Sequence, residues 1–587
     1  MRPQSRKLTR RYRRLISHAL LLAVFVLTEA RSPAGGQAAA TSGRGVQPIL
    51  DYISQAWVTL TRSMTDCESV ADPKIKVAPV LYLPAGMAEP GAVEKLASDC
   101  GVRIKHLPVA IHHLGEIDSG KIQPNGLLYL PNKYVVPGGR FNEMYGWDSY
   151  FIIRGLLQSG RVDLAKGMVD NFLFEIENYG AMLNANRTYY LTRSQPPFMS
   201  SMVVELYDAL QKSGGADREW LARAYADLEK DYTMWTSEPH LAGTTGLSRY
   251  YDFGEGPPAE AAQDEAGSYR KIAAYFFFHP AEADDYVARN SSESGTSSSG
   301  ALSTAGKDFT LRVCDLSSKS DAGGCEPAQE FQLSSDFYKG DRSMRESGFD
   351  VTFRFAPFGA ATHHFAPVCL NSLLYKNEKD LERISRWLGR SGDAERWANR
   401  AEERKILIAR YLWDEKAGMF FDFDLRTGHR STYNFATTFY PLWAGVATPE
   451  QAKAVAKNVS IFEKPGGLAT SANDSGAQWD LPYGWGNIQM LAVEGLRRYG
   501  FDADADRISF EFLSMVAENF RRDGTLREKY NVVTRSSEVH AELGYQMNVV
   551  GFGWTNAAFL ELLDGLPRNM KERLEREQDQ PLPAESR

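Results

Sequence analysis

Segments with the 3.6-residue periodicity of an amphipathic helix recur along most of this chain, and they restrict the folds open to it. About a dozen such segments, joined by variable loops with few convincing strands, favour an all-α fold in which paired concentric helices close into an (α/α) barrel. An irregular α-solenoid is the alternative, and the absence of a fixed repeat length disfavours it. The helical segments lie at 149–158, 162–178, 200–212, 219–237, 369–391, 392–412, 432–443, 449–459, 485–498, 503–519 and 555–563.

The rest of the 587 residues is assigned around this helical domain, which we place at 129–566. Residues 41–128 mix a helix start with strand-like pieces such as 80–83, and we interpret them as a lead-in packed on the barrel. A surface insertion is expected at about 281–332, where serine and other small polar residues accumulate. The charged, proline-bearing end at 567–587 is expected to be a flexible tail.

The first forty residues have the composition of a secretory signal peptide. Seven basic residues precede an apolar run from Leu15 to Leu27, and small residues follow up to Ala40. The alternative is a transmembrane anchor, but an apolar run of about 13 residues is shorter than the roughly 20 needed to cross a bilayer. We therefore predict an exported protein, periplasmic or secreted, with no stable membrane anchor after cleavage at Ala30 or Ala40.

Charge and cysteine content limit the partners. The net charge is −7 and becomes about −14 without residues 1–40, which makes nucleic acid an improbable partner. The five cysteines show no CxxC spacing, so no metal site is expected from them. In an oxidising compartment Cys67 could pair with Cys100, and Cys314 with Cys325, which would leave Cys369 unpaired.

Two adjacent histidine pairs, His112–His113 and His363–His364, are candidates for metal binding. Neighbouring side chains diverge in most backbone conformations, and no acidic residue lies beside either pair at ligand spacing. We therefore assign both pairs to packing or loop roles.

Four segments combine Trp, Gly, Asp, Glu and Arg, and this is the mixture that a sugar site needs. Aromatic rings cover the apolar face of a pyranose, while carboxylate, amide and guanidinium groups pair with vicinal hydroxyls. Any single Trp is equally well explained by packing between helices, but four such segments together favour a sugar pocket. They lie at 137–150, 345–355, 478–486 and 527–533.

Glycoside cleavage requires one carboxylic acid that protonates the bridging oxygen and a second carboxylate that attacks carbon or activates water. Asp350 follows Gly348 and Phe349, and partial desolvation there would favour a general acid. Glu528 lies between Arg527 and Lys529, whose charges favour the ionised, basic form. These two residues are the candidate catalytic pair, although a solvated salt bridge is the default role of any single acid.

Two motifs resemble the signatures of the trehalases of glycoside hydrolase family 37. Pro137 to Tyr150 (PGGRFNEMYGWDSY) resembles the first, and Gln478 to Trp485 (QWDLPYGW) resembles the second. Further similarity at 189–197, 346–350, 528–530 and 551–556 extends the resemblance over roughly residues 75 to 565.

This resemblance implies an (α/α)6 toroid that hydrolyses α,α-trehalose to two glucose molecules with inversion. Asp350 would be the general acid and Glu528 the general base, with their carboxyl groups roughly 6.5–9.5 Å apart. It implies a disaccharide as the partner, no metal and no organic cofactor; the oligomeric state is open, with a monomer favoured. The implied sugar contacts are Arg140, Phe141, Trp147, Asp148, Asn184, Arg193, Ser194, Gln195, Glu260, Gly348, Arg354 and Trp485.

The chain departs from the family pattern at several positions. Pro257-Pro258-Ala259-Glu260 stands where the family resembles Arg-Pro-Glu, so an arginine is missing there. Phe349 replaces a common Trp, and Gly486 and Tyr545 lie in changed stretches. These departures put the exact sugar in doubt, so a hydrolase of another α-glucoside or a non-catalytic sugar-binding homologue stays open as an alternative.

Overall fold

A computed structural model describes residues 45–71, 78–260, 266–289, 311–312, 330–544 and 547–580. The predicted signal peptide at 1–40, the predicted Cys314–Cys325 pair, Tyr545 and most of the 281–332 insertion lie outside these residues. Within the described part, no helix is both long and apolar enough to span a bilayer.

Helices form at all the segments with strong apolar periodicity, which confirms the predicted helical fold. In the 432–443 segment the helix is shorter than predicted and follows a 3-10 turn, η9 (Ala436–Phe439). These helices are α4 (Gly146–Gln158), α5 (Val162–Tyr179), α6 (Met199–Ser213), α7 (Arg218–Trp235), α12 (Val368–Trp387), α13 (Ser391–Tyr411), α14 (Tyr440–Ala444), α15 (Pro449–Lys457), α16 (Gly486–Arg498), α17 (Asp502–Asp523) and α18 (Gly553–Gly565).

Local sequence signals set several helix ends. The Asp217 carboxylate accepts hydrogen bonds from the N–H groups of Glu219 and Trp220, at 2.8 and 3.1 Å, and so caps α7. Thr448 and Gln451 form a reciprocal capping box at the start of α15. These caps satisfy backbone donors that the helices themselves leave unpaired.

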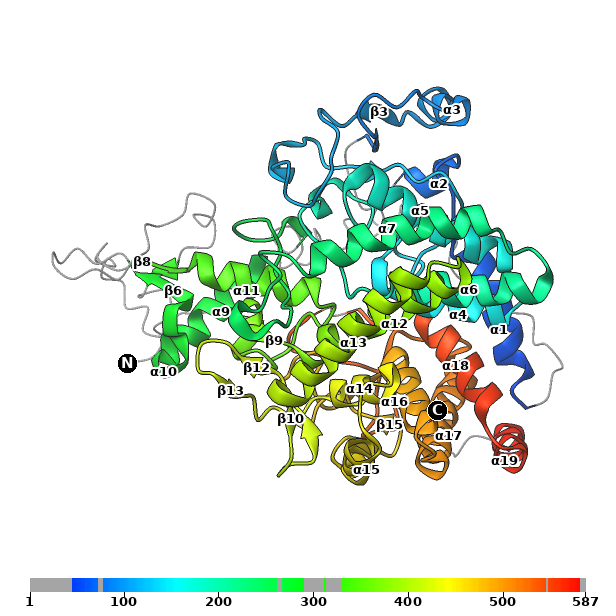
Figure 1. The fold of residues 1–587 in the computed structure, drawn as a ribbon, viewed down its shortest axis with the longest axis vertical. Coiled ribbons are helices and arrows are strands. Elements are labelled where there is room, and N and C mark those ends of the chain that lie inside the picture. The colour runs from blue at the N-terminus through cyan, green and yellow to red at the C-terminus, as the bar shows by residue number, and fades with distance from the viewer. Residues whose placement is uncertain are drawn as a thin grey trace, which may run out of the picture. The chain divides into compact units, whose positions relative to one another are not determined.

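The helices pack as neighbours in sequence and then close into a ring (Figure 1). Consecutive helices pair, as in α4 with α5, α12 with α13, and α16 with α17. The last helix of the series, α18, packs against the first, α4, although some 400 residues separate them, and this contact closes the (α/α)6 toroid. Apolar side chains from all these helices form one continuous core.

The lead-in carries a small parallel sheet that the helical pattern did not specify. Strand β2 (Val80–Leu83) confirms the strand predicted at 80–83 and pairs in parallel with β3 (Arg103–His106) and β4 (Leu127–Leu128). Three helices accompany it: α1 (Gln47–Thr59), α2 (Cys67–Val70) and α3 (Gly91–Cys100). Cys67 and Cys100 form a disulfide, which is one of the two pairings that the sequence left open, and Cys369 is buried and free.

The other sheets are small and lie in the connections between helices. Described pieces of the insertion form β6 (Val287–Arg289), β7 (Leu311–Arg312) and β8 (Glu330–Leu333), after helices α9 (Ala266–Phe278) and α10 (Pro280–Ala283). The remaining strand pairs are β1 (Thr61–Arg62) with β5 (Tyr134–Val135), β12 (Phe423–Asp424) with β9 (Phe365–Ala366) and β13 (His429–Arg430), β10 (Trp413–Asp414) with β11 (Met419–Phe420), β14 (Glu463–Lys464) with β15 (Gly467–Leu468), and β16 (Tyr483–Trp485) with β17 (Lys529–Asn531).

The flexible tail predicted at 567–587 is wrong for its first half, which forms helix α19 (Arg568–Asp579). Its charges pair along the helix, as in Arg573 with Glu577 at 2.8 Å, and Leu574 is fully buried. Only two apolar residues, Met570 and Leu574, stand among charged ones, and this periodic signal was too weak for a helix prediction.

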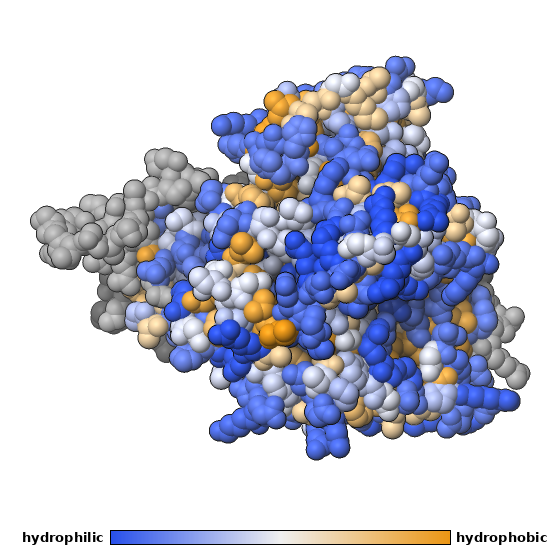
Figure 2. Space-filling view, in the orientation of Figure 1, coloured by the Kyte–Doolittle hydropathy of each residue, from blue (hydrophilic) through white to orange (hydrophobic). Residues whose placement is uncertain are grey.

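The surface is mixed in character. On the face shown in Figure 2, hydrophilic residues dominate and hydrophobic ones occur in small separate groups. Among the described residues, the large apolar side chains that are exposed come from distant parts of the chain, as in Val58, Phe278 and Ile406. Scattered exposure of this kind is ordinary for a soluble surface.

Helix α11 (Ser335–Glu346) was not predicted, and it is the element that leads directly to Asp350. Its large apolar residues are few, Phe337, Tyr338 and Met344, and charged and polar side chains complete its buried face. At Gly340 the helix backbone approaches the chain at Ala360 so closely that an added Cβ would lie 1.9 Å from the Ala360 carbonyl oxygen. Only glycine permits this contact.

We therefore expect Gly340→Ala to destabilise the protein by about 3 kcal/mol or more, because backbone atoms on both sides cannot yield as side chains do. Gly392→Ala in α13 is the control, since nothing lies within 4 Å of its added Cβ and helical alanine is favoured by about 0.5–1 kcal/mol. Urea unfolding of both variants measures the effect. Equal midpoints for the two would contradict the close approach of α11 to Ala360.

Candidate active site

One pocket contains both predicted catalytic carboxylates. Asp350 and Glu528 lie on its wall, together with six of the predicted sugar contacts. The structure thus brings together segments that are nearly 400 residues apart in sequence. The lining residues are Pro137, Phe141, Tyr145, Trp147, Asp148, Gln195, Gly348, Asp350, Gln478, Trp479, Trp485, Glu528, Phe552 and Trp554.

Asp350 is placed by the sharp turn that follows α11. Gly348 adopts a left-handed conformation with φ +75°, and a Cβ there would lie 2.7 Å from the Trp147 ring. This position therefore requires glycine for both its backbone angle and its contact. Arg345, at the end of α11, has Nη1 3.9 Å from Asp350 Oδ2, and the Asp350 side chain remains partly exposed to the pocket.

Glu528 directly precedes strand β17. Because β17 pairs with β16, and Lys529 lies opposite Trp485 in that pair, Glu528 is held near Trp485. Its backbone carbonyl accepts a hydrogen bond from Trp554 Nε1 at 3.0 Å. Its side chain, 6% exposed, has Oε2 3.4 Å from Nζ of the fully buried Lys529. This contact places a positively charged group beside the carboxylate that is predicted to be the general base.

A single glutamine side chain connects the segments of the two candidate catalytic residues. Gln478 accepts a hydrogen bond from Lys529 Nζ at 2.9 Å and donates one from Nε2 to the backbone carbonyl of Asp350. Because an amide offers a donor and an acceptor on opposite sides, it can serve both partners at once. Gln478 thus ties the position of Asp350 to that of Lys529 and Glu528.

Asp148 adds a third carboxyl group to the pocket. It lies in the first turn of α4 and is 5% exposed. Burial raises the pKa of Asp148 well above its ordinary value, and the negative charges of Glu528 and Asp350 raise it further. Asp148 is therefore biased towards its protonated form.

Aromatic rings form the walls of the pocket. Trp479 stacks on Trp485 with centroids 3.8 Å apart and planes 6° apart, and Trp147 and Trp554 pack against this pair. Phe141 contributes a further ring beside Tyr145. These rings present flat apolar faces of the kind that cover a pyranose.

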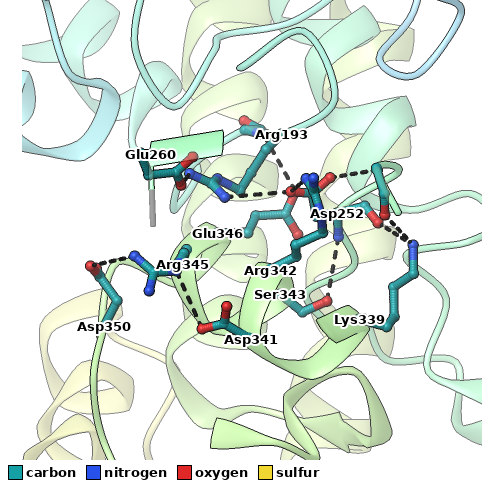
Figure 3. Close-up of polar contacts among 12 residues, drawn as sticks. Arg193, Asp252, Glu260, Lys339, Asp341, Arg342, Ser343, Arg345, Glu346 and Asp350 are labelled. Carbon is teal, nitrogen blue, oxygen red and sulfur yellow. Dashed lines mark hydrogen bonds and ion pairs between the residues drawn. The ribbon is translucent and has the colours of Figure 1, made fainter. Parts of the chain in front are cut away.

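A buried ion-pair network lies next to Asp350 (Figure 3). The Arg193 guanidinium contacts the Glu260 carboxylate and lies 3.5 Å from Asp252. Burial would raise the pKa of Glu260, but the charges of Arg193 and then Arg345 lower it below the ordinary value, so Glu260 is ionised. The predicted contacts Arg193 and Glu260 are thus paired with each other near the Asp350 side of the pocket.

Neither Arg193 nor Glu260 lines the pocket, and four other predicted contacts do not line it either. The Ser194 hydroxyl donates to the Met182 carbonyl, and Asn184 contributes backbone hydrogen bonds to Gly146 and Arg193. Arg140 lies over the Phe141 ring, with 4.8 Å between its Cζ and the ring centroid.

Arg354, the fourth, is fully buried and makes a two-pronged ion pair with Asp422, with Nε 2.7 Å from Oδ2. Its Nη1 also approaches Cys369 Sγ at 3.5 Å. In this arrangement its guanidinium group pairs with Asp422 and does not line the pocket described above.

Several residues of the site were not predicted. Trp479 and Gln478 lie inside the second quoted motif, so their position in it was the available signal. Lys529 lies in the quoted 528–530 stretch, beside Glu528. Arg345 begins the 345–355 segment that has the composition of a sugar site, so its position there was the available signal.

The ring of helices and the aromatic pocket with paired carboxylates define the class: an (α/α)6 toroid with the site typical of glycoside hydrolases. A family model described as Trehalase matches residues 93–309 and 329–567. The chain belongs to the trehalase family, as the motifs predicted. The stretch between the two matched parts falls within the predicted insertion.

Individual relatives agree with this assignment. A cytosolic neutral trehalase of Neurospora crassa is 39% identical over 482 residues, which cover 75% of this chain and 59% of the relative. A probable trehalase of Eremothecium gossypii is 35% identical over 570 residues, covering 86% and 71%. The chain therefore spans less than two thirds of the Neurospora relative's length. The solved structure of a neutral trehalase from Saccharomyces cerevisiae superposes with a TM-score of 0.71 at 30% identity, covering 90% of this chain and 96% of that one.

The same comparisons contradict the predicted export. Several relatives are named cytosolic neutral trehalases, including those of Neurospora crassa, Emericella nidulans and Saccharomyces cerevisiae. The prediction of a signal peptide and a periplasmic or secreted location is therefore wrong. It rested only on a basic segment followed by about 13 apolar residues, and such a short compositional pattern has little specificity.

The variant Asp148→Asn tests whether the pKa of Asp148 is raised in the folded protein. A carboxyl group whose pKa is raised on folding binds its proton more tightly in the folded state, so its contribution to stability is present at low pH and is lost as pH rises. We expect Asp148→Asn to be more thermostable than wild type at pH 8 and to lose that advantage at pH 5. Thermal unfolding at both pH values measures this, with the exposed Asp163→Asn in α5 as the control. An advantage that does not change with pH would contradict the raised pKa.

Proposed function

We propose that this protein hydrolyses α,α-trehalose to two glucose molecules by single displacement with inversion. The observation that carries the proposal is that Asp350 and Glu528, chosen from the sequence, line one aromatic-walled pocket. Membership of the trehalase family supports the substrate class. The match covers only 59% of the Neurospora relative, so the proposal concerns this chain and not the further sequence of that relative.

In the proposed reaction, Asp350 protonates the bridging oxygen while positive charge develops at the anomeric carbon. Glu528 removes a proton from a water molecule that attacks the opposite face of that carbon. The Lys529 ammonium group lies beside the Glu528 carboxylate, and Gln478 links Lys529 to the backbone of Asp350. The stacked Trp479 and Trp485 would cover the sugar rings and keep bulk water away.

A proton NMR time course with α,α-trehalose tests the reaction class. We expect α- and β-glucose in equal early amounts, before mutarotation, because inversion changes one anomeric centre only. Glu528→Gln and Asp350→Asn should each lower kcat by roughly 10²–10⁴-fold, the usual contribution of an acid or base. The exposed Glu538→Gln, ten residues after Glu528, is the matched control and should keep full activity. Two α-glucose molecules as the first products would refute inversion.

We also propose that Arg345 provides the arginine that the Pro257–Glu260 segment lacks. Arg345 is 4% exposed, lies beside Asp350, and its charge acts on Glu260 from within α11 (Figure 3). An arginine at this point can donate two parallel hydrogen bonds to vicinal hydroxyls of a sugar. The function of the missing residue would then be supplied from a different segment of the chain.

Arg345→Gln is expected to lower kcat/KM by roughly 10–100-fold, since a hydrogen bond from a charged group contributes about 1.5–3 kcal/mol. Arg345→Lys keeps the charge but loses the planar fork, so it should recover part of the loss. Steady-state kinetics with trehalose measures both, and circular dichroism checks that both variants are folded. Wild-type kcat/KM in a folded Arg345→Gln variant would exclude this role.

A further inference from the structure

A carboxylate and two imidazoles meet at one point outside the active site. Asp336 lies in the first turn of α11, and His363 and His364 form the end of a 3-10 turn, η8 (Thr362–His364). Nε2 of His363 is 3.0 Å from Asp336 Oδ1, and Nε2 of His364 is 3.3 Å from the same oxygen. The expectation that adjacent histidines diverge without an acidic partner is therefore wrong here, because a residue 27 positions earlier in the sequence supplies the carboxylate.

We propose that Asp336, His363 and His364 form a binding site for a divalent transition-metal ion, with Zn²⁺ as the ion that their ligand atoms suit best. Among the residues that the structure describes, they are the group of three such side chains with ligand atoms within 4.8 Å of one another. Two imidazole nitrogens and one carboxylate oxygen are ligands typical of Zn²⁺ and its neighbours, whereas Mg²⁺ and Ca²⁺ prefer oxygen alone.

The spacing of the ligand atoms fits such an ion. Zn²⁺ binds nitrogen and oxygen at about 2.0–2.1 Å, so two ligands of a tetrahedral site lie about 3.3–3.4 Å apart. The distances of 3.0 and 3.3 Å from Asp336 Oδ1 to the two histidine nitrogens are close to that value. An ion could therefore replace the two shared protons with shifts of a few tenths of an ångström. The His363 and His364 rings, with centroids 3.8 Å apart, already point the same way.

Unsatisfied polar atoms give independent support. Asp336 Oδ2 and His363 Nδ1 are buried, and neither has a hydrogen-bond partner among the described residues. Leaving a buried polar atom unpaired costs about 1–3 kcal/mol, and a cation beside the carboxylate would remove that cost for Oδ2. His363 is itself 4% exposed, which fixes its ring against Asp336.

The surroundings set the character of the site. Asp336 and His364 are partly exposed, so an ion can enter from solvent and keep one or two water ligands. Arg249 donates to the backbone carbonyl of His363 at 3.1 Å, and its charge opposes a bound cation. We therefore expect moderate affinity and exchange with solvent.

A bound ion would act on structure and not on the reaction. Asp336 is at the start of α11, whereas Arg345 and Asp350 lie at and beyond its end, about 15 Å along a helix at 1.5 Å per residue. The ion would fasten the start of α11 to η8 and so hold the helix that positions Asp350. This inference does not depend on which sugar the pocket accepts.

The test is a calorimetric titration of full-length, tag-free protein, first treated with a chelator and dialysed, with Zn²⁺ alone. We expect one equivalent to bind, and thermal unfolding to move up by about 2 °C when free Zn²⁺ is about 100 times Kd. The value of kcat should not change. Visible absorption of Co²⁺ in place of Zn²⁺ reports the nitrogen and oxygen ligands.

Two variants locate the ion. Asp336→Asn and His364→Gln preserve size and polarity, and each should weaken binding at least tenfold, as expected when a ligand is lost. The control is the double variant His112→Ala/His113→Ala, which removes the other adjacent histidine pair and should bind Zn²⁺ as wild type does. Absence of stoichiometric binding to the wild type, or binding unchanged in both folded ligand variants, would overturn the proposal. Binding without a rise in unfolding temperature would overturn the fastening of α11.

Discussion

The buried charges of helix α11 are the constraint on which the active site depends. Each ion removed from water costs several kcal/mol unless partners compensate it. Lys339 Nζ donates to the backbone carbonyls of Asp252 and Gly254, and Arg342 pairs with the Asp252 carboxylate at 3.1 Å (Figure 3). These contacts fix the orientation of α11 against the 250–257 loop. The end of α11, and with it Asp350, is fixed as a result.

The same network reaches the pocket through shared partners. Asp252 lies between Arg342 and Arg193, and Arg193 also contacts Glu260. Glu346, the last residue of α11, accepts the Tyr251 N–H at 2.6 Å and lies 3.3 Å from His240. The charge balance around the substrate pocket is thus set by the pairs that hold α11 in place. A change to one pair alters the field at Asp350 as well as the stability of the helix.

The periodicity of apolar residues predicted those helices that bury an apolar face. The helices α4 to α7, α12, α13 and α16 to α18 have apolar faces against one core, so their positions followed from the sequence. Helix α11 was not predicted because it contains few apolar residues, and charged side chains with distant partners, such as Arg342 with Asp252, complete its buried face. The contact of Asp336 with His363 and His364 was not predicted either, because it joins residues that are distant in sequence. In contrast, Asp350 and Glu528 were found through motifs, since a catalytic turn constrains several adjacent residues at once.

The departures from the family motif gain meaning from their location. Phe349 is fully buried and packs against Trp147, Trp479 and Phe435, so it lies behind the pocket wall and not on it. At Gly486 the start of α16 meets α18, where an added Cβ would lie 3.0 Å from Ala558.

Phe349 and Gly486 therefore lie among the residues that support the pocket wall. The residues that line the pocket in these segments are those of the family motifs. The segment at Pro257 and Ala259 instead lines a neighbouring cavity that includes Arg342. The departure with a direct consequence for the sugar is therefore the missing arginine, and α11 already brings a guanidinium group to that side of Asp350. This arrangement favours retention of the family's disaccharide over a change of substrate.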